Sequence, residues 1–178
     1  MNKQWWIPLI IVIAFGIESI VPNFLPVYFF SQYVIIVPRI LFIVLLFITV
    51  FYDEKQGQLY AFLSGVVMDI VFTEIIGIYI FWYPATIYLV RKVMKYWHNN
   101  LFVTGLVAFI AVTFLETGIF WIHAILNTVD VPFKYFVEHR LIPTLIFNFI
   151  IYLVFSYPLK KRLVKLAKMK SEESMFQS

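Results

Sequence analysis

Long apolar runs constrain this chain more than any other feature of its sequence. A transmembrane α-helix needs about 20 apolar residues to cross a hydrocarbon layer roughly 30 Å thick. Runs of about this length lie near residues 5–22, 34–52, 57–73, 75–94, 100–126 and 139–158. We therefore predict an all-α fold, a polytopic membrane helix bundle of about six transmembrane helices. The run at 57–73 contains Ser64, Gly65 and Asp69, which makes it a candidate for a broken or partly re-entrant helix.

The composition indicates that lipid is part of the solvent. Hydrophobic residues make up 62% of the 178 residues and charged residues only 13%, which is more apolar surface than a soluble domain of this size can bury. Several tryptophans lie where an apolar run meets polar residues, as in an interfacial aromatic belt. Cysteine is absent, which excludes disulfide frameworks, zinc–thiolate sites and thiol nucleophiles. The N-terminal run lacks a small-residue cleavage site, so we expect it to remain as the first helix.

Lysines and arginines predict the orientation of the helices in the membrane. They gather at 91–100 and in the tail at 159–178, and the positive-inside rule places both segments in the cytoplasm. With an even number of crossings, a cytoplasmic N-terminus also puts Lys3 and Lys55 on that side. We therefore predict a transmembrane helix bundle at 1–158, a basic cytoplasmic tail at 159–178 and two cytoplasmic termini. The net charge of +4 indicates the anionic surface of a lipid bilayer as the partner of these residues, and no nucleic acid.

The ionisable side chains Glu18, Asp69, Glu116 and His123 lie inside predicted spans and need an explanation at that depth. A charge at the centre of a membrane helix costs roughly 2.5 to 3.5 kcal/mol on insertion scales, so we expect these groups to face one another and not lipid. Glu116 and His123 are seven positions apart on one helix face, and Asn127 extends that polar stripe. Two interpretations remain open: hydrogen bonds that hold helices together, or a proton or substrate path of the kind found in transporters. If Glu116 only holds helices together, Glu116→Gln should be tolerated and Glu116→Leu should be worse.

Two arginines lie near the predicted outer ends of their spans. Arg39 and Arg140 are long enough to extend their guanidinium groups to the interface, or to pair with Glu138 and Asp130. Neither arginine needs a catalytic role on this interpretation.

A ridge of small residues leads to Asp69. Ala61 and Gly65 are four positions apart, which permits close contact between helices, and Asp69 follows one turn later. Gly77 makes a tight turn before the next span. We therefore predict that Gly65 is a close-packing contact and that Asp69 caps or hydrogen-bonds the neighbouring helix.

Enzyme chemistry finds little support in the sequence. Common motifs for phosphate binding, serine hydrolysis and zinc-dependent hydrolysis are absent, and His98, His123 and His139 are far apart. We predict that the protein is not an enzyme and has no catalytic residues, no cofactor and no metal. The residues singled out are instead candidates for helix packing or partner contact: Glu18, Arg39, Gly65, Asp69, Gly77, Glu116 and His123.

Several stretches of the chain carry a resemblance to a known family. They are Phe15–Ser19 in the first span, Arg39 at the start of the second, Gln56–Gly57 at the start of the third, Gly65–Thr73 with Gly77–Tyr79, and Glu116 late in the fifth. On these residues the chain resembles the MreD family of rod shape-determining proteins of Gram-positive bacteria. The resemblance implies a non-enzymatic, multi-pass subunit of the cell-elongation machinery in the bacterial cell membrane. It also implies MreC as a partner through the bilayer, with MreB and the peptidoglycan synthases as further partners.

The resemblance also implies an alternative function. The family is similar in fold to the substrate-binding S components of energy-coupling-factor transporters, which bind small vitamins from the outer side. Such a subunit needs an outward-open pocket lined by convergent polar side chains. The predicted outer segments, Asn23–Tyr33 and Asn127–Glu138, offer few polar side chains, and an apolar, aromatic periphery suits a partner helix better.

Overall fold

The computed structural model describes residues 5–24, 34–73, 75–97 and 100–176, and these residues form helices joined by short connections. In chain order they are α1 (Trp6–Phe24), α2 (Ile40–Phe51), α3 (Glu54–Phe72), α4 (Ile78–Tyr96), α5 (Leu101–Ile125), α6 (Phe133–Phe136), the π-helical turn η2 (Val137–Leu141) and α7 (Ile142–Phe176). The predicted all-α fold is confirmed for this part of the chain. Lys3 and most of the predicted outer segment Asn23–Tyr33 lie outside the described residues.

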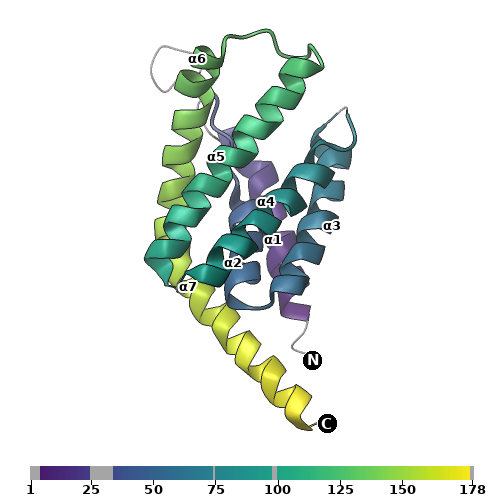
Figure 1. The fold of residues 1–178 in the computed structure, drawn as a ribbon, viewed down its shortest axis with the longest axis vertical. Coiled ribbons are helices and arrows are strands. Elements are labelled where there is room, and N and C mark those ends of the chain that lie inside the picture. The colour runs from purple at the N-terminus through teal and green to yellow at the C-terminus, as the bar shows by residue number, and fades with distance from the viewer. Residues whose placement is uncertain (1–4, 25–33, 74, 98–99, 177–178) are drawn as a thin grey trace.

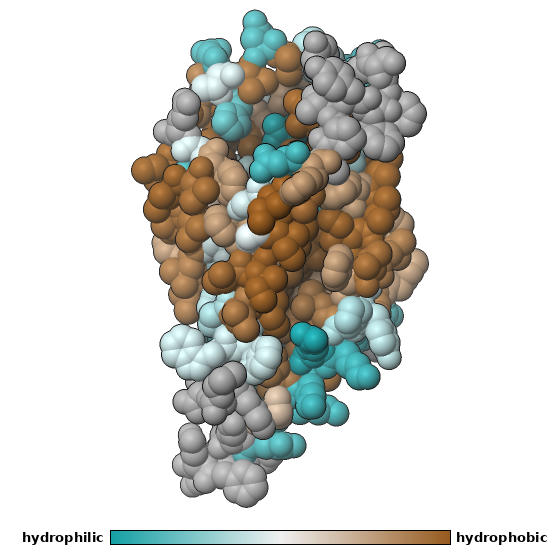
Figure 2. All heavy atoms as spheres, turned by 180° about the vertical axis from the view of Figure 1, so that it is seen from behind, coloured by the Kyte–Doolittle hydropathy of each residue, from teal (hydrophilic) through white to brown (hydrophobic). Residues whose placement is uncertain are grey.

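Long apolar helices dominate the structure. Among the described residues, three helices are long and apolar enough to cross a membrane, namely α1, α5 and the continuous helical rod Phe133–Glu172 formed by α6, η2 and α7. α2 is also apolar but has only 12 residues. Figure 2 shows a broad apolar band across the middle of one face, with polar side chains toward both ends. These features are those of an integral membrane protein.

The helices run alternately in opposite directions between the two ends of the bundle (Figure 1). One end carries the start of α1, the turn between α2 and α3, the end of α4 and the last turns of α7. The other end carries the turn between α3 and α4 and the loop between α5 and α6. The first and last described helices therefore begin and end on the same side of the bundle, which is the arrangement that an even number of crossings produces.

α2 forms the centre of the bundle. Every side chain from Leu41 to Thr49 is buried, and the helix contacts α1, α3, α4, α5 and α7. A helix that is apolar on all sides is stable only when its neighbours or lipid enclose it. α3 comes close to α2 because Gly57 lies against Thr49, where even a methyl group would overlap the threonine side chain.

The second predicted span differs from the structure at its start. Residues 34–39 are not helical, and α2 begins only at Ile40, so the prediction of a helix from residue 34 is wrong. Pro38 explains part of the difference, because it has no N–H group to donate and disfavours helical geometry at Val37 before it. The apolar run continues through a non-helical segment that is buried only at its end, at Pro38 and Arg39, whereas Ile35 is 51% exposed.

The third predicted span is more regular than the sequence suggests. α3 is continuous from Glu54 to Phe72, so it is not a broken helix. Asp53 caps it by accepting hydrogen bonds from the backbone N–H groups of Lys55 and Gln56, each at 2.9 Å. The polar residues inside α3 are buried against neighbouring helices, which makes a break unnecessary.

The basic tail continues α7 as a helix. α7 passes through Pro158 and extends to Phe176 (Figure 1). The Nζ atom of Lys170 lies 2.5 Å from Oδ2 of Asp53, and Lys160 lies 4.9 Å from the centroid of the Phe51 ring. These contacts hold the tail against the turn between α2 and α3.

Candidate functional site

The interior contains an ion pair that joins α2 to α5. Arg39, the last residue before α2, has a side chain that is 1% exposed. Its Nε donates to Oε1 of Glu116 at 2.5 Å, and its Nη2 donates to the Tyr79 hydroxyl at 3.1 Å. Glu116 on α5 is fully buried. The guanidinium therefore has both a counter-ion and a neutral acceptor, which a buried charge needs if it is not to destabilise the fold.

A second arginine binds the same carboxylate. Nε and Nη2 of Arg140, in η2, each lie 3.2 Å from Oε2 of Glu116. Each oxygen of Glu116 thus faces one arginine, and segments far apart in the sequence meet at a single carboxylate. We call Arg39, Tyr79, Glu116 and Arg140 the ion cluster.

The ion cluster corrects the predicted roles of the two arginines. Among the described residues, neither arginine pairs with Glu138 or Asp130, and Glu138 instead lies 3.8 Å from Lys134 on the surface. Arg39 does not extend to the interface, because the non-helical segment before α2 is buried at Pro38 and Arg39, and the side chain of Arg39 lies in the interior. The place of Arg39 at the start of an apolar run had suggested a more superficial position.

Two polar residues of α7 form hydrogen bonds with the backbone groups of the non-helical segment that leads to Arg39. Oγ1 of Thr144 accepts from the N–H of Val37 at 3.1 Å, and Nδ2 of Asn148 donates to the Val37 carbonyl at 2.9 Å. Oδ1 of Asn148 accepts from the N–H of Arg39 at 2.7 Å. Non-helical backbone at membrane depth is stable only where protein groups meet its hydrogen-bonding needs. Neither residue was predicted from the sequence, although Asn148 is a polar residue in the middle of an apolar run.

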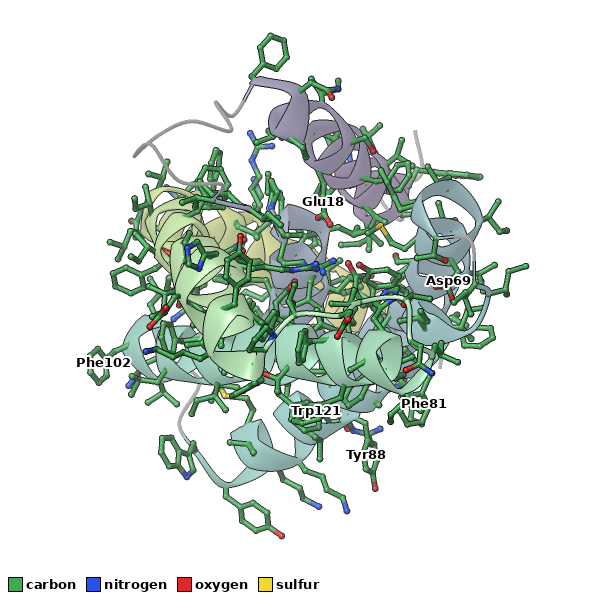
Figure 3. All side chains as sticks on the ribbon, turned by 90° about the horizontal axis from the view of Figure 1, so that it is seen from above. Glu18, Asp69, Phe81, Tyr88, Phe102 and Trp121 are labelled. Carbon is green, nitrogen blue, oxygen red and sulfur yellow. The ribbon has the colours of Figure 1, made fainter. Side chains whose placement is uncertain are left out.

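Glu18 caps the start of α2 from α1. Its side chain is buried, and Oε2 accepts a hydrogen bond from the N–H of Leu41 at 2.7 Å. The first N–H groups of a helix have no partner within the helix, so an acceptor from a neighbouring helix satisfies one of them. Figure 3 shows Glu18 pointing from α1 into the bundle. Glu18 therefore fixes α1 to a point two residues away from Arg39.

Asp69 caps the start of α4 in the same way. It is fully buried and accepts hydrogen bonds from the N–H groups of Gly77 at 2.9 Å, Tyr79 at 2.8 Å and Ile80 at 3.0 Å. Gly77 has a φ of +119°, a conformation that residues with a side chain rarely adopt. Because Asp69 fixes the first turn of α4, it also fixes the position of Tyr79, whose hydroxyl accepts from Arg39.

α3 approaches the start of α4 most closely at Gly65. A methyl group at this position would lie 2.5 Å from the carbonyl oxygen of Tyr79 and 2.9 Å from the Cα atom of Ile80. Both atoms belong to the backbone and cannot move aside as the end of a flexible side chain can. The absence of a side chain at Gly65 therefore allows Asp69, one turn later, to reach the N–H groups of α4.

Comparison with known proteins places the chain in a family. The family described as rod shape-determining protein MreD matches residues 3–166, which is nearly the whole chain. The chain belongs to the MreD family. The rod shape-determining protein MreD of Bacillus subtilis (strain 168) is 31% identical over 166 residues, covering 93% of this chain and 96% of that protein. The cell shape-determining protein MreD of Streptococcus pneumoniae (strain ATCC BAA-255 / R6) is 27% identical over 160 residues, covering 87% and 91%. No solved structure matches the chain.

Membership of the MreD family confirms the resemblance seen in the sequence. The protein is a membrane protein involved in the determination of rod cell shape, and its family is not known as a family of enzymes. Three residues that carried the resemblance, Arg39, Asp69 and Glu116, lie in or next to one connected set of contacts. Asp69 holds Tyr79, Tyr79 accepts from Arg39, and Arg39 donates to Glu116.

Among the described residues, His123 of this MreD-family protein forms no hydrogen bond with the ion cluster. Its Nδ1 is 2.8 Å from Oγ1 of Thr128, in the turn that follows α5. α5 ends at Ile125, and Asn127 has a φ of +54° in the following turn. The predicted polar stripe therefore does not reach Asn127, because helical periodicity applies only as far as the helix continues, whereas Glu116 and His123 both lie within α5. In the part of the chain that the structure describes, no group of three histidine, aspartate or glutamate side chains is placed to hold a metal ion.

The interior contacts of this MreD-family protein are suited to fixing helices relative to one another. Glu18 joins α1 to α2, Asp69 joins α3 to α4, and Glu116 joins α5 to the start of α2 and to η2. Within the described residues, Oε1 of Glu18 is the one carboxylate oxygen among these three acids that is buried without a hydrogen-bond partner. The other carboxylate oxygens of Glu18, Asp69 and Glu116 accept hydrogen bonds from arginine side chains or backbone N–H groups of the protein itself.

Proposed function

We propose that this protein is a non-enzymatic, multi-pass scaffold of the cell-elongation machinery in the bacterial cell membrane. It binds MreC through the bilayer and so connects MreB filaments and the peptidoglycan synthases to one membrane site. Membership of the MreD family supports a role in rod shape. The observation that carries the scaffold role is the mutual pairing of the interior polar groups, in which Glu116 binds two arginines and Asp69 caps α4. A catalytic or transport site would instead need such groups to face a substrate.

The packing of the interior favours a scaffold over the substrate-binding S component of an energy-coupling-factor transporter. Pockets for small molecules have volumes of about 300–1,000 Å³ and present polar groups to the ligand. The hollow between α2, α5 and α7, whose lining includes Ile43, Gly105 and Tyr152, has a volume of ≈ 10 Å³. That volume is about enough for one water molecule. The helices at this point are packed against one another and leave no room for a vitamin. A larger hollow of ≈ 620 Å³ lies at the tail end of the bundle, which we propose is cytoplasmic, and not on the outer side from which S components bind.

Purification of the full-length, tagged protein from the membrane of its bacterial host tests the partner. We expect MreC to be recovered from a mild detergent extract, together with peptidoglycan synthases, because a scaffold acts by stable contact. An extract from cells with the untagged protein is the control. Recovery of a transporter coupling subunit without MreC would contradict the scaffold and favour the alternative.

We also propose a bundle of six crossings with both termini in the cytoplasm. The end of the bundle that carries the tail also carries the basic residues at 91–95, and positive charge is retained on the cytoplasmic side of membrane proteins. The chain has no cysteine, so single cysteines report on the two sides. In intact cells, a membrane-impermeant thiol reagent is expected to label Asn127→Cys and to label Ser171→Cys only after permeabilisation. Labelling of Ser171→Cys in intact cells would show the opposite orientation.

A further inference from the structure

A hollow opens at the tail end of the bundle, between the end of α2, the start of α3 and the last turns of α4. Its volume is ≈ 620 Å³, and the residues that line it include Arg91, Lys92 and Lys95. We call it the basic hollow. The ion cluster does not extend into it, and a volume of this size is in the range of about 300–1,000 Å³ that bound small molecules occupy.

The two acidic residues in the wall of the basic hollow already have cationic partners. Oε2 of Glu54 accepts from Nε of Arg91 at 2.6 Å, and Oδ2 of Asp53 accepts from Nζ of Lys170 at 2.5 Å. Burial raises the pKa of Asp53, but hydrogen bonds from Lys170 and from backbone N–H groups at the start of α3 lower it by more, to below its ordinary value of 3.8. Asp53 is therefore ionised and paired at neutral pH.

Lys92 and Lys95 supply positive charge that these acids do not neutralise. Neither lysine forms an ion pair with a carboxylate of a described residue, and both are exposed. The Nζ atom of Lys92 lies 4.9 Å from the centroid of the Tyr88 ring, which holds the ammonium group near the wall of the basic hollow. Two ammonium groups one helical turn apart are a binding arrangement for an anion such as phosphate.

An exposed apolar stripe flanks Lys92 on α4. Leu89, Val93 and Tyr96 are 43%, 42% and 84% exposed, and their spacing places them on the same helix face as Lys92. A tyrosine at the end of a membrane helix belongs to the interfacial aromatic belt. A hydrocarbon chain can therefore lie along Leu89 and Val93 while a charged headgroup stays beside Lys92. A free anion would make no use of this stripe.

We propose that the basic hollow binds the phosphate of an anionic membrane phospholipid through Lys92 and Lys95, with an acyl chain along Leu89 and Val93. The site follows from the position of these helices in a membrane and does not depend on MreC.

Thermal stabilisation of the detergent-purified, full-length protein by added lipid tests this site. We expect dioleoylphosphatidylglycerol to raise the melting temperature in a saturable manner and dioleoylphosphatidylcholine to raise it much less. Lys92→Gln/Lys95→Gln is expected to increase the half-saturating concentration of dioleoylphosphatidylglycerol at least about tenfold, because it removes both charges that attract the phosphate. Lys92→Arg/Lys95→Arg keeps both charges and should restore binding to within about threefold of the wild type.

A matched variant separates the basic hollow from a general effect of charge. Lys165→Gln/Lys168→Gln removes two lysines of the tail and is expected to change the half-saturating concentration less than about twofold. If this control raised the half-saturating concentration as much as Lys92→Gln/Lys95→Gln does, the proposal would be overturned, because the loss of any two lysines would then weaken lipid binding equally. Inorganic phosphate that stabilises the protein as well as the phospholipid does would also overturn it, since the site would then take a free anion. All these lysines are on the surface, so the variants are expected to melt like the wild type before lipid is added.

Discussion

Replacing Glu116 by leucine is expected to destabilise the protein by about 3–5 kcal/mol, because a buried charge then loses its counter-ion. Arg39 is 1% exposed and cannot turn its guanidinium group into water without opening the bundle. Arg140 loses its carboxylate as well, although its side chain is 30% exposed. The melting temperature of the detergent-purified protein and its monodisperse fraction in size-exclusion chromatography measure the effect. Both are expected to fall strongly.

Glu116→Gln is expected to be nearly as damaging, which corrects the expectation from the sequence that it would be tolerated. Glutamine keeps the shape of the side chain, but Arg39 remains charged at every accessible pH and would lie buried without an opposite charge. Glu138→Gln is the matched control, because Glu138 is 51% exposed and its partner Lys134 is 3.8 Å away. This control is expected to change stability by less than about 0.5 kcal/mol. A melting temperature of Glu116→Gln equal to that of the wild type would show that Arg39 does not need the charge of Glu116.

Gly65→Ala is expected to destabilise the folded protein by about 1–3 kcal/mol, because the added methyl group must displace the backbone of α4. Gly65→Leu is expected to destabilise it more. The new Cβ atom would lie 2.5 Å from the Tyr79 carbonyl oxygen, and separation of the helices would also pull Asp69 away from the N–H groups that it caps. Gly16→Ala on α1 is the matched control, since no atom lies within 4 Å of its added Cβ. This control should be neutral or slightly stabilising, because alanine favours a helix over glycine by about 1 kcal/mol. Equal melting temperatures for the two alanine variants would contradict the close contact at Gly65.

Local parts of this arrangement can be predicted from the sequence. Asp69 and Gly77 are eight positions apart, so the acid, the turn and the start of the next helix lie within one helical hairpin. The costs of burying a carboxylate and of leaving helix N–H groups without partners then predict the cap. The spacing of Ala61 and Gly65 similarly predicts a close contact, although it does not predict which backbone atoms Gly65 meets.

Contacts between distant segments cannot be predicted in this way. Arg39 meets Glu116 only because the non-helical segment before α2 lies beside α7, and that depends on hydrogen bonds between Val37 and the side chains of Thr144 and Asn148. A hydropathy pattern reports that the segment is apolar but does not distinguish non-helical backbone from a helix. Asn127 shows a second limit, because its predicted face was projected along a helix that ends before it, at Ile125.

If the ion cluster acts only by holding helices in place, replacing Arg39 and Glu116 together should restore the membrane abundance and the cell shape that are lost when either residue is replaced alone. Apolar replacement of a whole buried ion pair is often neutral, whereas loss of one partner is strongly destabilising. The decisive measurement is cell shape in bacteria that lack their own MreD and express Arg39→Met, Glu116→Leu or the double variant, with membrane abundance measured in parallel. We expect each single variant to be scarce and the cells round, and the double variant to restore both abundance and rods. Round cells with the double variant at wild-type abundance would show that the charges themselves take part in the function.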